Sequence, residues 1–262
     1  MMKIYTKETL SDALIEIKNR GWIPNARPGN SGGIGNTLED LLGIEENNLP
    51  IPNAAEWELK SQRYDTVSLT TLFHMEPSPR ALRLVPKILL PCYGWKHEQA
   101  GSLYPLNEMS FRQTISGFAY SDRGFIVKID DLNRKIIVSF DYQKVSPHHF
   151  EWLNNVKQRI GLGELAPQPY WGFDDLFHKA GTKLLNTFYV QAEVLKQNGM
   201  EFYHYNRIYM LRGFRIENLA KTILDGNLFV DFDARTHHNH GTKFRLRQNA
   251  LPSLYSDITE IK

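Results

Sequence analysis

The sequence predicts a mixed α/β fold in which helices flank a sheet whose strands run in both directions. Segments with helical periodicity and segments with alternating, strand-like polarity occur along the whole 262-residue chain. With 42% hydrophobic residues, the chain can bury a large core, either as one domain or as two lobes that share a sheet. The sequence contains no internal repeat, linker or low-complexity segment.

The helices are predicted from apolar spacing and from residues that begin or end a helix. Thr6 precedes apolar residues at helical spacing and Gly21 follows them, which indicates a first helix of about four turns. A loop rich in proline and glycine at 24–35 precedes a short helix, which we expect to begin at Thr37 and end at Gly43. Two further helices are expected at 173–185 and 216–224.

Strands are predicted where polar and apolar residues alternate between turn signals. The segments that fit are 55–62, 67–74, 125–129, 135–140, 187–195, 200–205, 228–232 and 243–247. Asn198 and Gly199 favour a tight hairpin because both residues accept positive φ, and residues 131–134 supply a second turn. Strands mixed with helices in this order predict mixed strand directions.

Composition limits where the protein acts and which sites it can contain. No segment approaches the roughly 18 apolar residues of a membrane helix, and the N-terminal residues lead into a polar helix without a signal peptide, so we expect a cytoplasmic protein. The single cysteine, Cys92, excludes an internal disulfide and a cysteine-rich metal site, and we expect it to be a small buried hydrophobic residue.

Basic residues are concentrated in one part of the chain, although the net charge is only +2. Between residues 212 and 247 there are seven Lys or Arg against four acidic residues, together with three histidines. Such a segment could face phosphates, and a scattered, solvated surface is the alternative.

The expected strand at 55–62 carries residues suited to phosphodiester hydrolysis. On a strand, Glu56, Glu58 and Lys60 share one face, whereas Trp57 and Leu59 point to the other face and into the core. Hydrolysis requires carboxylates that hold a hard divalent cation and a cationic group that orients water or offsets developing charge. A Glu-x-Lys tripeptide is common by chance, so an ordinary solvent-facing strand is the alternative.

The surrounding sequence resembles the MvaI/BcnI family of type II restriction endonucleases, relatives of the MutH nicking enzyme. The resemblance is strongest in GIGNTLEDLL at 33–42, EENN at 45–48 and ELK at 58–60. Similar segments follow in the same order as in that family, namely LTTLFH at 69–74, QTISG at 113–117 and HNHGTKFR at 238–245.

The resemblance implies a nuclease fold of the PD-(D/E)xK kind, a mixed sheet flanked by helices, with two lobes around DNA. Residues 1–120 would form mainly the catalytic lobe and residues 121–262 mainly the recognition lobe, although later elements could join the catalytic core. The catalytic residues of the family fall on Glu39, in the first turn of its expected helix, on Glu58 and on Lys60.

A fourth catalytic position departs from the family pattern. Asn53 stands five residues before Glu58, where the family has a metal-binding aspartate. Asn53 and Glu58 are therefore the expected ligands of Mg²⁺, for which Mn²⁺ could substitute. Because asparagine offers a neutral carbonyl oxygen, we expect weaker metal binding than an aspartate would give.

The loop before the last basic strand is the expected DNA-reading element. His238, Asn239 and His240 can reach base edges in the major groove, with Lys243 for the backbone and Arg245 for a guanine or a phosphate. Without the resemblance, the histidines would indicate a solvated turn or, less well, a zinc site. In relatives the middle residue is often aspartate, so the family's usual target need not carry over. We also expect Arg80 to contact phosphate.

The resemblance implies a Mg²⁺-dependent endonuclease that cuts double-stranded DNA at a short specific site, one strand at a time. It would act as a monomer, and no segment indicates a dedicated protein partner. One alternative is a DNA-binding protein that has lost catalysis, of which Asn53 would be the mark. The other is a MutH-type repair nickase, whose cutting would depend on a mismatch-recognition partner.

Overall fold

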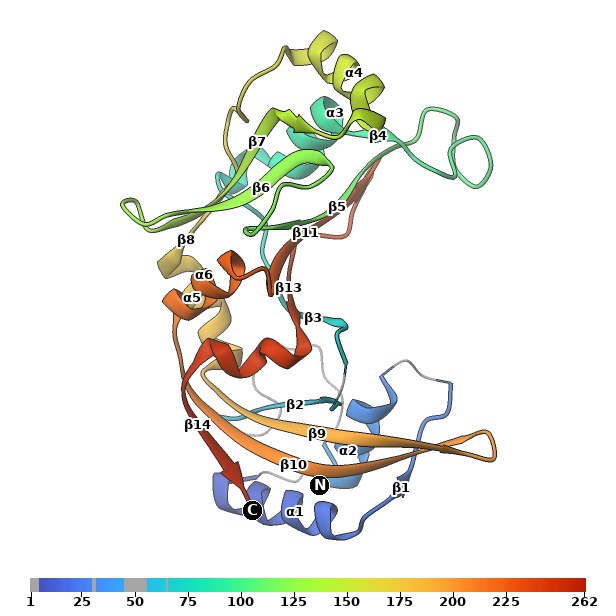
Figure 1. Cartoon of the computed structure of the whole chain (residues 1–262), viewed down its shortest axis with the longest axis vertical. Helices are drawn as coiled ribbons and strands as arrows, with labels where there is room; N and C mark the ends of the chain where they lie inside the picture. Colours follow the sequence, from blue (N-terminus) through green and yellow to red (C-terminus); the bar gives the residue numbers. More distant parts are fainter. Residues whose placement is uncertain (1–4, 30–31, 45–55, 65) are drawn as a thin grey trace. The chain divides into compact units, whose positions relative to one another are not determined.

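The computed structural model describes residues 5–29, 32–44, 56–64 and 66–262 (Figure 1). Helices occur together with strands that pair in both directions, which confirms the mixed α/β prediction. The chain forms two compact units and passes between them four times. Unit 1 comprises Met1–Ser68, His178–Asn218 and Gln248–Lys262, and unit 2 comprises Leu69–Phe177 and Leu219–Arg247.

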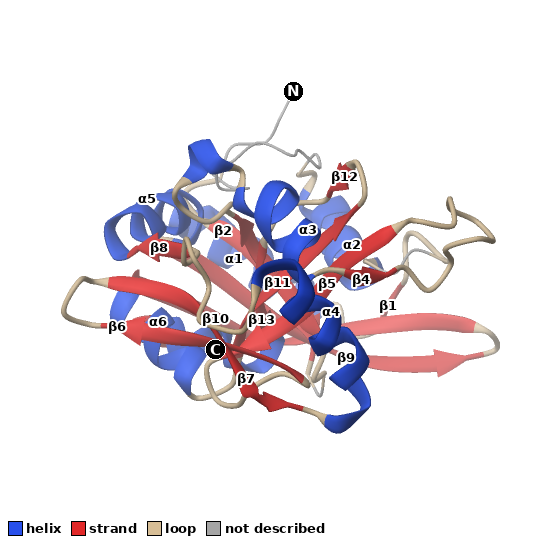
Figure 2. Cartoon of the chain, turned by 90° about the horizontal axis from the view of Figure 1, so that it is seen from above, coloured by secondary structure: helices blue, strands red, loops and turns tan. Residues whose placement is uncertain are grey.

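Unit 1 is built on a five-stranded mixed sheet in the order β1-β10-β9-β2, with β14 paired to β10. The pair β2–β9 is parallel and the others are antiparallel. β9 and β10 form a long hairpin (Figure 2) whose turn is at Asn198 and Gly199, both with positive φ, as predicted. The strands are β1 (Ile23–Pro24), β2 (Glu58–Arg63), β9 (Asn186–Gln197), β10 (Met200–Phe214) and β14 (Tyr255–Ile261).

Two helices of unit 1, α1 (Lys7–Asn19) and α2 (Gly33–Leu42), share the apolar core of this sheet. α1 begins after Thr6 as predicted, where Thr6 and Thr9 form a capping box. α2 ends at Gly43 as predicted, but it begins at Gly33, four residues before Thr37. Thr37 is buried and does not cap the helix; its hydroxyl accepts the Ala26 N–H and so holds the preceding loop. Glu39 therefore lies beyond the first turn, which corrects that expectation.

Unit 2 contains two sheets. The larger follows the order β3-β13-β11-β5-β4, with β12 paired to β11, and the smaller follows β6-β7-β8. The strands are β3 (Leu69–His74), β4 (Trp95–Lys96), β5 (Met109–Ser116), β6 (Arg123–Asp130), β7 (Lys135–Val145), β8 (Tyr170–Gly172), β11 (Leu228–Arg235), β12 (His238–Asn239) and β13 (Lys243–Arg247). The predicted turn at 131–134 joins β6 to β7.

The remaining helices lie in unit 2 or continue from one unit into the other along the chain. They are α3 (Leu90–Tyr93), α4 (Phe150–Ile160), α5 (Phe173–Leu184) and α6 (Ile216–Leu224), of which α5 and α6 span unit boundaries. Cys92, on α3, is half-buried rather than fully buried, and its burial raises the pKa of the thiol. None of the described helices combines the length and the apolar character needed to cross a membrane.

Candidate active site

The strand β2 brings Glu58 and Lys60 together. Side chains two residues apart project from the same face of a strand, and here Lys60 Nζ lies 2.6 Å from Glu58 Oε1. Glu58 is buried, with 1% of its side chain exposed, whereas Lys60 is 26% exposed. Trp57 and Leu59 belong to the core of unit 1, as the alternation predicted.

A second lysine, which the sequence did not indicate, reaches the same carboxylate. Lys183 lies in the last turn of α5, and its Nζ is 3.7 Å from Glu58 Oε1. No local pattern could have found it, because Lys183 is remote from β2 in the sequence and its helix shows ordinary amphipathic spacing. Both ammonium groups therefore converge on one oxygen of Glu58.

The other oxygen of Glu58 makes no such contact. Oε2 is buried and has no hydrogen-bond partner among the described residues. A buried polar atom without a partner is unusual and costly. Carboxylate oxygens are preferred ligands of Mg²⁺, so the arrangement of Glu58 fits a divalent cation.

Two hydroxyl groups near Glu58, those of Thr187 and Tyr255, are neutral. Thr187 of β9 pairs with Glu58 of the neighbouring strand β2, and the Thr187 hydroxyl is 2.7 Å from the Tyr255 hydroxyl. Burial raises the pKa of Tyr255 and the negative charge of Glu58 adds to this effect, against the hydrogen bond with Thr187. Tyr255 therefore keeps its proton at neutral pH.

Of the other expected catalytic residues, Glu39 lies within the described part of the chain and Asn53 lies outside it. Glu39 is half-buried on α2, which packs against β2. β2 begins at Glu58, three residues after the start of the predicted strand, and Glu56 is exposed in the preceding turn. The shared face is thus observed for Glu58 and Lys60 and not for Glu56.

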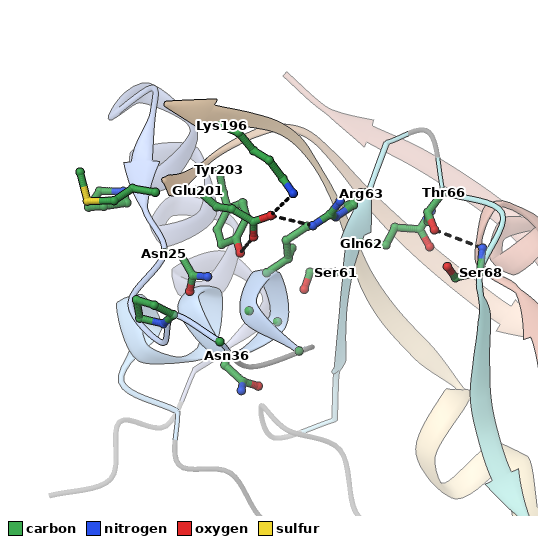
Figure 3. Close-up of a pocket in the computed structure, with 18 of the residues that line it drawn as sticks. Asn25, Asn36, Ser61, Gln62, Arg63, Thr66, Ser68, Lys196, Glu201 and Tyr203 are labelled. Atoms are coloured by element: carbon green, nitrogen blue, oxygen red, sulfur yellow. Dashed lines mark hydrogen bonds and ion pairs between the residues drawn. The ribbon is translucent and has the colours of Figure 1, made fainter. Parts of the chain in front are cut away.

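A hollow of about 1060 Å³, lined by polar and apolar residues, adjoins β2 within unit 1 (Figure 3). One wall is the start of α2, and hydroxyl and amide side chains line much of the rest. Arg63 and Lys196 each lie 3.2 Å from Glu201 Oε1. A hydrogen bond from Tyr203, followed by the two cations, keeps the pKa of Glu201 below its usual value. The polar residues of the lining are Asn25, Asn36, Ser61, Gln62, Arg63, Thr66, Ser68, Lys196, Glu201, Tyr203 and Gln248.

In unit 2, the loop predicted to read bases contains a short strand. His238 and Asn239 form β12, which pairs with β11, and the exposed rings of His238 and His240 lie 4.1 Å apart. Glu76 accepts the Thr242 N–H at 2.8 Å and so fixes the end of the loop. In the part of the chain that the structure describes, three potential metal ligands gather only at Asp122, His148 and His149, which gives no support to zinc at the histidine loop.

The basic residues of β13 lie beside acidic residues of β11. Lys243 Nζ is 3.0 Å from Asp233 Oδ2, and Arg245 Nη1 is 3.6 Å from Asp231 Oδ2. Burial alone would raise the pKa of Asp233, but Lys243 and then Arg112 bring it below its ordinary value. These residues line a polar hollow of about 340 Å³. Arg80 is exposed in the separate short turn Arg80–Leu82.

The sequence and the fold of the chain are similar to those of known proteins. The model of the MvaI/BcnI restriction endonuclease family matches residues 11–255. The chain is similar to the structure of the restriction endonuclease MvaI in complex with cognate DNA, with 26% identity and a TM-score of 0.70 over 98% of this chain and 100% of that chain. Its similarity to MvaI in the absence of DNA has 26% identity and a TM-score of 0.61 over 100% of both chains. Comparison with curated proteins gives no significant match.

Proposed function

Because the chain belongs to the MvaI/BcnI restriction endonuclease family, we propose that it is a type II enzyme that hydrolyses phosphodiester bonds at a short sequence in double-stranded DNA with the aid of a divalent cation. Family membership makes the chain a site-specific deoxyribonuclease. The observation that carries the finer proposal is the buried Glu58, which is paired with Lys60 and has one oxygen without a partner.

Glu58 and Asn53 would hold Mg²⁺, and Mn²⁺ could replace it. Glu58 Oε2 fits this role because it is buried and lacks a hydrogen-bond partner among the described residues. A bound ion would supply Lewis-acid stabilisation of the phosphate and a lower pKa for the attacking water. Asn53 would contribute a neutral oxygen, so we expect the ion to bind less tightly than it would with the family aspartate.

The remaining catalytic roles belong to Lys60 and Glu39. Lys60 positions or helps to deprotonate the water that attacks phosphorus, and its charge offsets the charge that develops as the P–O bond to the leaving oxygen breaks. Glu39, on the helix that packs against β2, supports the metal or Lys60 through its negative charge.

Double-stranded DNA is the substrate and partner of this proposal. The similarity to MvaI, whose structure is known with cognate DNA, supports it. Unit 1 would carry the chemistry, and the DNA backbone would cross the hollow beside β2, whose lining includes Arg63 and Lys196. Unit 2 would carry recognition, with base contacts from His238, Asn239, His240 and Arg245. Lys243 and Arg80 would contact phosphates.

We further propose a monomer in the cytoplasm that needs no protein partner. Each chain supplies its own Glu58–Lys60 pair. A monomer with one such site would cut the two strands of its target in succession, so a nicked product would precede the linear one.

Supercoiled plasmid incubated with Mg²⁺ or Mn²⁺ tests this function. We expect nicking followed by linearisation, and no cutting in EDTA. Lys60→Met is the matched control. The substitution removes the ammonium group of Lys60, and the variant should still bind DNA in a gel shift. Sequencing the ends of the products then gives the target and the cut position. A gel shift by the unsubstituted chain without any cutting, under all metal conditions, would contradict the proposal.

A second candidate function is DNA binding without cleavage, which Asn53 favours because one negative charge near the metal is lost. Asn53→Asp separates the two candidates. If the unsubstituted chain only binds DNA and the substituted chain cuts it, the asparagine is the sole defect. A MutH-type nickase would instead cut only when a mismatch-recognition protein is added.

A further inference from the structure

We propose that Lys183 is a second cationic positioning residue of the catalytic carboxylate, which holds Glu58 Oε1 when Lys60 turns toward the reacting phosphate. The inference rests on the proposed nuclease function. Lys183 passes no proton and forms no bond to the substrate. Its task is to compensate the negative charge of the buried Glu58 and to hold its carboxylate in one orientation.

The first argument is geometric. Lys60 Nζ and Lys183 Nζ lie 2.6 Å and 3.7 Å from the same atom, Glu58 Oε1. Both therefore lie near the oxygen that would not face the metal, because Oε2 is the atom without a partner. Two cations on one side of the carboxylate and an open oxygen on the other define which way Glu58 points.

The second argument concerns burial. Glu58 is 1% exposed, and a buried carboxylate is strongly destabilised unless a partner compensates its charge. Lys60 cannot serve Glu58 fully while it also positions water or stabilises the phosphate in the transition state. Without Lys183, the step that engages Lys60 would leave Glu58 with less compensation at the moment when its orientation matters.

The third argument is that the fold fixes Lys183 in place. Ala180 and Leu184 flank it on α5 and both are fully buried, so the last turn of the helix is anchored in the core. A lysine at this position is also favoured by the partial negative charge at the helix C-terminus. The Lys183 side chain remains 31% exposed, which leaves its head room to approach Glu58 more closely.

The experiment compares Lys183→Met and Lys183→Arg with Lys179→Met, which removes the same charge one turn earlier on α5. Three quantities are measured on the full chain: the single-turnover cleavage rate at saturating DNA, the DNA affinity without divalent metal at several salt concentrations, and the Mn²⁺ affinity without DNA by calorimetry. Thermal unfolding confirms that each variant is folded, and Lys183→Gln replaces Lys183→Met if the latter is not.

For Lys183→Met we expect the cleavage rate to fall by about 100-fold, the loss that a displacement of about 1 Å at a catalytic group can cause. DNA affinity and its salt dependence should stay unchanged. Mn²⁺ affinity should rise, because the cation would then compensate the part of the buried negative charge of Glu58 that Lys183 otherwise compensates. Lys183→Arg should recover most of the rate, and Lys179→Met should match the unsubstituted chain.

Three results would overturn the inference. One is an unchanged cleavage rate in a folded Lys183→Met variant. Another is lower DNA affinity with a salt slope reduced by about one at an unchanged saturated rate, because Lys183 would then be a phosphate contact. The third is unchanged or weaker Mn²⁺ binding, which needs no cleavage to measure. If the unsubstituted chain does not cut DNA, the proposed function fails, while the Mn²⁺ measurement still decides the role of Lys183.

Discussion

Two carboxylates, Glu58 in unit 1 and Asp233 in unit 2, each have two cationic partners but use them differently. Arg112 Nε lies 2.8 Å from Asp233 Oδ1, and Lys243 Nζ lies 3.0 Å from Asp233 Oδ2. Both oxygens of Asp233 therefore form an ion pair. In Glu58, by contrast, the ammonium groups of Lys60 and Lys183 both lie near the same oxygen, Oε1. Its Oε2 is left without a hydrogen-bond partner among the described residues.

The difference indicates what each carboxylate does. Asp233 is satisfied by protein groups and therefore orients Lys243 and Arg112, which suits a surface whose donors and acceptors meet a ligand in fixed positions. Glu58 is more deeply buried, with 1% of its side chain exposed against 16% for Asp233, and it is incompletely satisfied. An incompletely satisfied, buried carboxylate beside two cations suits a metal ion and a phosphate.

The largest expected effect comes from neutralising the two carboxylates in turn. Glu58→Gln should lower the cleavage rate by about 10³-fold or more, the several kcal/mol that a correctly held metal contributes. Its Mn²⁺ affinity should fall in parallel. Asp233→Asn should leave Mn²⁺ affinity unchanged and alter DNA affinity instead. Calorimetry with Mn²⁺ and single-turnover cleavage provide the two measurements.

Both substitutions replace a carboxylate by its isosteric amide, so each serves as the control for the other. Equal losses of Mn²⁺ affinity in the two variants would remove the distinction between an open and a satisfied carboxylate. Thermal unfolding excludes a general loss of structure as the cause of either result.

The part of the site that lies on one strand was predictable from the sequence. Alternation places Glu58 and Lys60 on one face of β2 and Leu59 in the core, because the side-chain period of a strand is fixed by backbone geometry. The hairpin at Asn198 and Gly199 was equally local, since it depends on positive φ at two adjacent residues.

Features that depend on tertiary contacts were not predictable. α2 begins at Gly33 rather than Thr37, and a side chain at Gly33 would place its Cβ 2.5 Å from the Tyr203 hydroxyl of β10. β2 pairs with β9 in parallel, and no local pattern reveals this pairing because the two strands are far apart in the chain. Lys183 reaches Glu58 through the same long-range arrangement, which no spacing within β2 or α5 reveals.

An intermediate effect is expected at Glu76, which anchors the end of the loop at 238–242 that we propose reads DNA bases. Thr242 is fully buried, and its N–H donates to Glu76 Oε1 at 2.8 Å. Glu76→Ala would leave this N–H without its acceptor, at a cost of about 1–3 kcal/mol. We expect faster hydrogen exchange at residues 238–242 and about tenfold weaker binding to the target site, roughly 1.4 kcal/mol.

Glu76→Gln is the matched control, because its amide keeps a carbonyl oxygen that can accept the same bond. It should retain most of the affinity and protection from exchange. Unchanged exchange at 238–242 in Glu76→Ala would show that Glu76 does not hold the loop. Cleavage at saturating DNA should change little in either variant, in contrast to the substitutions at Glu58.

The smallest expected effect separates the hollow beside β2, which we propose contacts the DNA backbone, from the proposed catalytic pair Glu58 and Lys60. Arg63→Ala removes one cation from the hollow beside β2, where Arg63 also pairs with Glu201 at 3.2 Å. Loss of one phosphate contact should reduce the slope of log affinity against log salt by about one, with a modest fall in affinity. Arg20→Ala is the control, because Arg20 is also an exposed arginine of unit 1 paired with a glutamate, at 2.7 Å, and it does not line the hollow. If the slope of log affinity against log salt is the same for the Arg63 and Arg20 variants, the DNA backbone does not cross the hollow. The roles proposed for Glu58 and Lys60 would not be affected by that result.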